Sequence, residues 1–143
     1  MSTNEPQWSG ILERVVAQSE SDDPAAMTRA AVGNWEKLSA ILIPLLGHFS
    51  FYLIYRRSLD LSKSVFPWLP MATGSSQVHD SFAELGRAFE GQGSSELARV
   101  NLALLHTFAE LLAALIGERL TAVYLRAAFK NKLVPDTTGE NRL

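Results

Sequence analysis

The chain contains one helical pattern twice, 70 positions apart, and this constrains its fold more than any other feature. Leu-Leu-Gly-His at 45–48 precedes an amphipathic run, and Leu-Ile-Gly-Glu at 115–118 precedes another. Each copy predicts a helix, a glycine that ends it, and a second helix. Upstream of the glycines, apolar residues recur at helical spacing at Trp35, Leu38 and Leu42 in one copy and Leu105, Phe108 and Leu112 in the other.

The remaining segments also predict helices, and no run of alternating β-branched residues with a tight turn predicts a hairpin. Asp23-Pro24 is a strong helix start, because Asp caps and proline suits the first helical position. We predict an all-α fold, a single helical bundle of five or six helices built from two pseudo-repeated helix-Gly-helix units. The expected helices cover about 8–17, 24–46 with an interruption at Gly33-Asn34, 49–66, 78–90 with a capping box at Ser81 and Glu84, 94–116 capped by Ser94 or Ser95, and 118–132.

A chain of 143 residues has the size of one domain and can bury a sufficient core without disulfides or metal. We therefore expect a single all-α domain over 1–143. Its parts are an N-terminal helix and linker at 1–22, a bundle core at 23–133 and a frayed tail at 134–143.

Composition and motifs exclude most chemical classes. The net charge is −2 with scattered cations, which argues against a nucleic-acid partner. The absence of cysteine excludes thiol nucleophiles and thiolate metal sites. The chain has no Glu-x-x-His, no Gly-x-Ser-x-Gly and no phosphate-binding glycine loop. We expect no catalytic residues, no metal and no cofactor.

One stretch allows a membrane interpretation, since the eighteen residues 38–55 carry no charge. The equivalent stretch of the second copy contains Glu110, Glu118 and Arg119, which a simple span would not tolerate. Two helices meeting at Gly47 explain the run better. With no signal peptide at the N-terminus, we expect a cytoplasmic protein with no membrane partner.

The segment 97–115 has a heptad seam formed by Leu97, Asn101, Leu104, Phe108, Leu111 and Leu115. Asn101 is the polar member of the seam. It either fixes the register of a helix pair or lies near the helix end in contact with water.

Two histidines are candidate ligand-binding or phosphoacceptor residues. His106 and Glu110 are one turn apart, beside the small residues Ala103 and Ala113, so this face could open a pocket. The alternative is a local pair at the rim of the core. His48 follows the first glycine, and its alternative is a partly buried turn residue.

Further residues are candidates for contact with a partner. Arg56 and Arg57 could meet an acidic surface, or could be solvated. Trp68 and Leu69 lie in an apolar loop, Phe-Pro-Trp-Leu-Pro, which either folds back over the bundle as a lid or forms an interaction patch.

The segments 43–47, 55–59 and 66–69, followed by 111–121, resemble a pattern in an uncharacterised family of bacterial all-helical proteins. The resemblance covers roughly 35–129. It implies a bacterial, cytosolic origin near signalling genes, and no activity, because none is assigned to that family.

These observations favour a non-catalytic regulatory or scaffolding module that acts through protein–protein contacts, as a homodimer. Two alternatives are a histidine phosphotransfer module using His106 or His48, and a binder of a small apolar ligand near His106 and Glu110.

Overall fold

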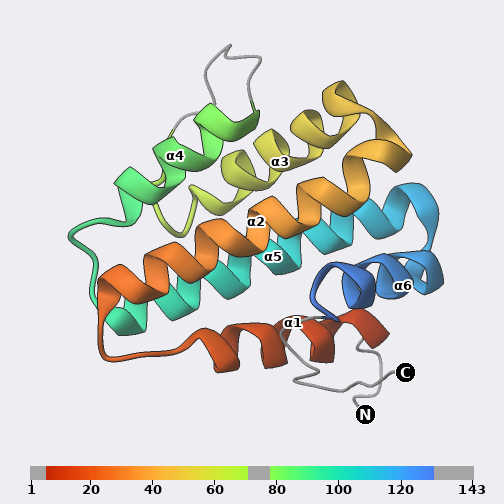
Figure 1. The fold of residues 1–143 in the computed structure, drawn as a ribbon. Coiled ribbons are helices and arrows are strands. Elements are labelled where there is room, and N and C mark those ends of the chain that lie inside the picture. Colours follow the sequence, from red (N-terminus) through yellow and green to blue (C-terminus); the bar gives the residue numbers. More distant parts are fainter. Residues whose placement is uncertain (1–5, 71–77, 131–143) are drawn as a thin grey trace.

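The computed structural model describes residues 6–70 and 78–130, and within these ranges the chain is helical with no strand (Figure 1). The predicted all-α fold is therefore confirmed. The helices are α1 (Gln7–Ser19), α2 (Pro24–Leu46), α3 (His48–Ser62), α4 (Val78–Phe89), α5 (Ser94–Ile116) and α6 (Glu118–Ala128).

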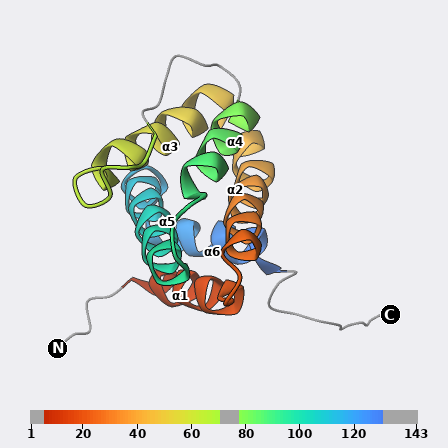
Figure 2. The same cartoon turned by 90° about the vertical axis from the view of Figure 1, so that its left-hand side faces the viewer.

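The helices form three layers, best seen in Figure 2. The long helices α2 and α5 make the middle layer, with α3 and α4 on one side and α1 and α6 on the other. Helix α3 packs on α5 and α4 on α2, while α1 packs on α5 and α6. Each outer layer thus combines a helix from each half of the chain, so the two halves interlock.

At an offset of 70 positions, α2 and α5 have the same bounds, whereas α3 and α6 begin at equivalent residues but end at different ones, Ser62 and Ala128. Helices α2 and α5 both have 23 residues, and α3 and α6 both begin directly after a glycine. The same offset also relates α1 to α4, a correspondence that the repeated sequence pattern does not include. Leu12 and Val15 of α1 are buried, and so are the residues 70 positions later, Phe82 and Leu85 of α4. The shared bounds accord with a repeat, whereas the repeat itself stays a prediction.

Gly47 and Gly117 form the corners between the long and the short helices. Their φ angles are 90° and 93°, with ψ angles of 157° and 158°. These angles lie in an extended region with positive φ that only glycine adopts readily. Each glycine N–H still closes its helix by donating to the carbonyl four residues back, at 2.7 and 2.8 Å.

At the other helix starts, the observed capping residues can be compared with the predicted ones. The Asp23 side chain accepts from the Ala25 N–H at 3.1 Å, as predicted. Neither Ser94 nor Ser95 caps α5, because Gly93 occupies the cap position without a side-chain bond. Ser81 lies inside α4 and is 7% exposed, so the predicted capping box is wrong.

Two helices differ from the bounds that the sequence predicts. Helix α2 continues through Gly33-Asn34, since the surrounding buried residues hold it in one piece. Helix α3 ends at Ser62 rather than near Phe66, and the following turn carries Phe66 and Leu69 into the core, at 3% and 2% exposure. The predicted end of α6 near 132 and the tail at 134–143 lie outside the described residues.

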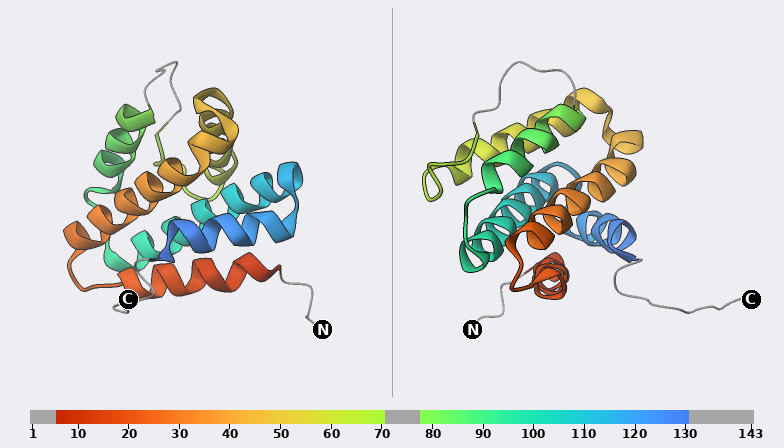
Figure 3. Two further views of the ribbon diagram at one scale, coloured as in Figure 1. Left: turned by 45° about the vertical axis from the view of Figure 1, so that its right-hand side comes forward. Right: turned by 60° about the vertical axis from the view of Figure 1, so that its left-hand side comes forward.

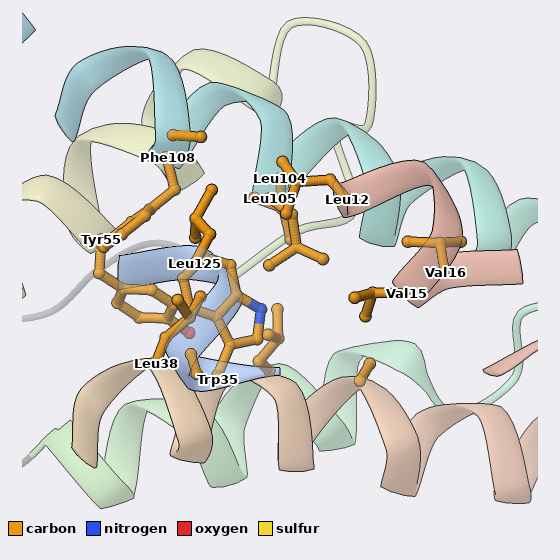
Figure 4. Packing of buried hydrophobic residues seen from close by; sticks show 14 of the residues in the cluster. Leu12, Val15, Val16, Trp35, Leu38, Tyr55, Leu104, Leu105, Phe108 and Leu125 are labelled. Atoms are coloured by element: carbon orange, nitrogen blue, oxygen red, sulfur yellow. The ribbon is translucent and has the colours of Figure 1, made fainter. Parts of the chain in front are cut away.

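Aromatic side chains join the layers at the centre of the bundle (Figure 4). The ring of Trp35 on α2 meets Tyr55 on α3 at 5.0 Å and Phe108 on α5 at 5.2 Å, both edge to face. Leu38 and Leu125 fill the space beside them. Burial raises the pKa of the Tyr55 hydroxyl well above its usual range.

The uncharged stretch 38–55 is not one helix, since Gly47 divides it between α2 and α3. Within the described ranges, α5 alone is long and apolar enough to span a membrane, with a mean hydropathy of 1.4 over its most apolar window. It is a middle-layer helix that packs against α1, α2, α3 and α6, and such core helices commonly pass this test.

Candidate functional site

The pair of His106 and Glu110 lies on the face of α5 that no other helix fully covers. Helical spacing of four and three brings Arg99, Ala103, His106 and Glu110 onto this face, because the opposite side of α5 is used for the core. His106 also contacts α1, where its ring meets Trp8 edge to face at 4.8 Å. The histidine therefore lies at the boundary between the core and solvent.

His106 and Glu110 form a loose local pair. The His106 Nδ1 and Glu110 Oε2 atoms are 3.7 Å apart, and the two side chains are 38% and 61% exposed. This separation is longer than a hydrogen bond, and an exposed pair of this kind stabilises a helix only weakly. The local-pair interpretation accounts for both residues without a bound ligand.

Two hollows flank this pair, where the sequence suggested one pocket. A groove of about 520 Å³ runs beside Arg99, Leu102, Ala103, His106 and Thr107, with Val65 and Phe66 as its opposite wall. A second hollow of about 490 Å³ lies towards the end of α5, lined by Pro6, Trp8, Glu110, Ala113, Ala114 and Glu118. We call the first hollow the α5 groove.

Arg99 lies at one end of the α5 groove and is paired with a carboxylate on its own helix. Its Nη1 atom lies 2.6 Å from Glu96 Oε1, and its guanidinium stands over the Phe66 ring at 5.3 Å. Glu96 also accepts from Trp68 Nε1 at 3.4 Å. The groove thus has an apolar floor, an anchored cation at one end and an imidazole at the other.

The loop containing Trp68 and Leu69 folds back on the bundle, as the lid interpretation expected. Trp68 is half-buried, with its ring 6.2 Å from Phe66 and 5.8 Å from Phe89. Leu69 is 2% exposed because the turn after α3 directs it inward, so the prediction that it contacts a partner is wrong. The loop forms a wall of the bundle near the α5 groove.

Asn101 is 4% exposed, and its Oδ1 atom has no partner among the described residues. The interpretation of Asn101 as a wet residue near a helix end is therefore wrong, and it offers no surface to a partner. The reason is that the seam of α5 faces the middle of the bundle from Leu97 to Phe108, whereas its last member, Leu115, is exposed. Asn34, which the sequence did not single out, is fully buried, and neither of its amide atoms has a partner in residues 6–70 and 78–130.

The other candidates are apart from the groove. His48 is the first residue of α3 and is exposed at the first glycine corner. Arg56 and Arg57 are exposed two turns further along α3. Sequence periodicity missed the apolar residues that remain exposed near the corners, Phe49 and Leu115 above all, because helical spacing alone does not show where a core ends.

Among residues 6–70 and 78–130, no group of three or more His, Asp or Glu side chains could hold a metal ion. No protein-family model, curated protein or solved structure matches the chain. Membership of a bacterial family stays a prediction, and function has to be inferred from the surfaces of the fold.

Proposed function

We propose that the protein is a non-catalytic regulatory or scaffolding module that acts through protein–protein contacts, with the α5 groove as its docking surface. The observation that supports this proposal most is the groove itself, an open hollow with an apolar floor and a cation at one end. Grooves of this kind accept the apolar face of an amphipathic helix. Val65, at its rim, is 62% exposed and would be covered by such a helix.

The partner in this proposal is a second copy of the chain, and the location is the cytoplasm. Homo-oligomers are the most common assemblies of soluble proteins, and two-fold dimers are the most common among them. A dimer through the α5 groove would bury Leu102 and Ala103, which the fold leaves partly exposed.

Size-exclusion chromatography with light scattering over a range of concentrations tests this proposal. We expect a dimer that Ala103→Arg converts to a monomer, because the longer cationic side chain fills the groove. Ala127→Arg, on the exposed face of α6, is the matched control and should leave the dimer intact.

A monomer at all concentrations would overturn the homodimer. A photo-crosslinking amino acid at position 103, with position 127 as control, would then report any other protein in the groove. The absence of position-specific crosslinks would overturn protein docking there.

A second candidate function, binding of a small apolar molecule, is supported by the same groove. Its volume is in the range of ligand sites and its lining is mostly apolar, whereas Arg99 and His106 already lie beside the carboxylates of Glu96 and Glu110. Native mass spectrometry would show a retained molecule that Ala103→Arg releases. Phosphotransfer receives less support, because the Glu110 carboxylate would repel a phosphoryl group on His106.

A further inference from the structure

A second surface lies at the end of the bundle where the two glycine corners meet the solvent. Helices α2 and α5 both end there, and α3 and α6 both turn back from it (Figure 1, and the left view of Figure 3). We define the corner end as the last turns of α2 and α5 together with the first turns of α3 and α6. Most of the large apolar side chains that the described residues leave exposed are at this end: Leu45, Phe49, Leu53, Leu115, Leu120 and Val123.

The exposure is large for side chains of this size. Phe49 is 74% exposed and Leu115 is 64% exposed, one from each corner. Leu46 and Ile116, which precede the two glycines, pack against the core, whereas Leu45, Phe49 and Leu115 remain exposed. Exposed apolar patches of this kind mark contacts with a protein or a membrane.

Arginines share a face with the exposed apolar residues on both short helices. On α3, Arg56 follows Phe49 and Leu53 at spacings of four and three, whereas on α6 Arg119 precedes Val123 and Arg126 follows it. Arg56 lies about 10 Å along the helix axis from Phe49, at 1.5 Å per residue. When the corner end points into the bilayer, α3 enters by its N-terminal turn, so this axial separation places Arg56 on the headgroup side of Phe49.

The acidic residues of the loops lie at the other end of the bundle. Glu20, Asp22 and Asp23 are exposed between α1 and α2, and Glu90 is exposed between α4 and α5. Within three turns of the corners, the exposed carboxylates of α2, α5 and α6 are Glu36, Glu110 and Glu118, and the exposed arginines of α3 and α6 are Arg56, Arg57, Arg119 and Arg126. This small excess of cations favours a negatively charged surface.

We propose that the corner end binds the surface of an anionic phospholipid bilayer, with the apolar corners inserted and the arginines at the headgroups. The contact is peripheral, and no helix spans the bilayer. It departs from the sequence-based expectation of no membrane partner, because only the tertiary structure shows which apolar residues stay outside the core. It uses a different surface from the α5 groove and does not depend on protein docking there.

Vesicle co-sedimentation of the whole protein tests the proposal, with phosphatidylcholine vesicles and with vesicles that also contain phosphatidylglycerol. We expect binding to the second kind, weakened by salt, and about fivefold weaker binding for each of Arg56→Gln and Arg57→Gln. Leu53→Ser and Leu61→Ser form a matched pair, since both leucines are on α3 and each is 44% exposed. Leu53→Ser at the corner end should weaken binding about tenfold or more, and Leu61→Ser should leave it unchanged.

Three results would overturn the proposal. These are no binding to either vesicle, equal binding to both, or equal effects of Leu53→Ser and Leu61→Ser. Self-association that Leu53→Ser abolishes, in the absence of vesicle binding, would assign the corner end to a second copy instead. Since Ala103→Arg leaves the corner end unchanged, failure of the lipid proposal and failure of the α5 groove proposal can be distinguished.

Discussion

Replacing a corner glycine by alanine isolates the backbone contribution to stability. An added Cβ atom at Gly47 or Gly117 meets no heavy atom within 4 Å, so steric overlap is excluded. The φ angles of 90° and 93° remain unfavourable for any L side chain. We expect Gly117→Ala to lower the free energy of unfolding by about 1–3 kcal/mol, the usual cost of holding a residue in such a region.

The chain offers matched controls at Gly10 and Gly33, which lie inside α1 and α2. An added Cβ atom there also meets nothing within 4 Å, and the backbone is helical. The same substitution should therefore raise the free energy of unfolding by about 0.5–1 kcal/mol, because alanine loses less conformational entropy than glycine on folding. One chemical change thus acts in opposite directions at two kinds of position.

Urea unfolding followed by tryptophan fluorescence measures both effects, since Trp8 and Trp35 are almost fully buried. The midpoints should move in opposite directions while the slope stays constant. The reasoning would be refuted if Gly117→Ala and Gly33→Ala moved the midpoint in the same direction. A change of slope would indicate that the substitution altered the folded or unfolded ensemble instead.

Two further substitutions test the polar groups in the core. Asn34→Leu should raise the free energy of unfolding by about 1–3 kcal/mol, because it removes a buried amide that has no partner among the described residues. Thermal or urea unfolding measures the change, and destabilisation would show that the amide is paired. The raised pKa of Tyr55 implies that the unfolded chain, with an ordinary tyrosine pKa of 10.0, releases this proton first as the pH rises. The stability is therefore fully present below about pH 10 and is lost above it by up to about 1.4 kcal/mol per pH unit, and Tyr55→Phe should flatten that alkaline loss in pH-dependent unfolding.

Local signals in the sequence predicted the helices well because each signal acts within one or two turns. Asp23-Pro24 began α2, and the two glycines ended α2 and α5, as expected. The same kind of signal failed at Ser94 and Ser81, where serine was available but another residue or an earlier turn began the helix. Helix starts with several neighbouring serines cannot be assigned from spacing alone.

The candidate site was only partly predictable. The sequence brought His106, Glu110 and Ala103 together, because all three share one helix and its periodicity. It could not show that Trp8 of α1 covers the histidine ring, or that the turn after α3 supplies Val65 and Phe66 as the other wall of the groove. Those contacts join residues far apart in the chain.

The sequence by itself determined the helical class, the glycine breaks and the apolar faces, since these follow from backbone preference and from the spacing of side chains along one helix. Tertiary structure decided how the layers interlock, and therefore which apolar faces become core. Asn101 and Leu69 are buried, although polarity suggested exposure for the first and its loop position for the second. Phe49 and Leu115 are exposed, although their apolar side chains suggested burial. Burial depends on what packs against a face, and that is a property of the assembled bundle rather than of any one segment.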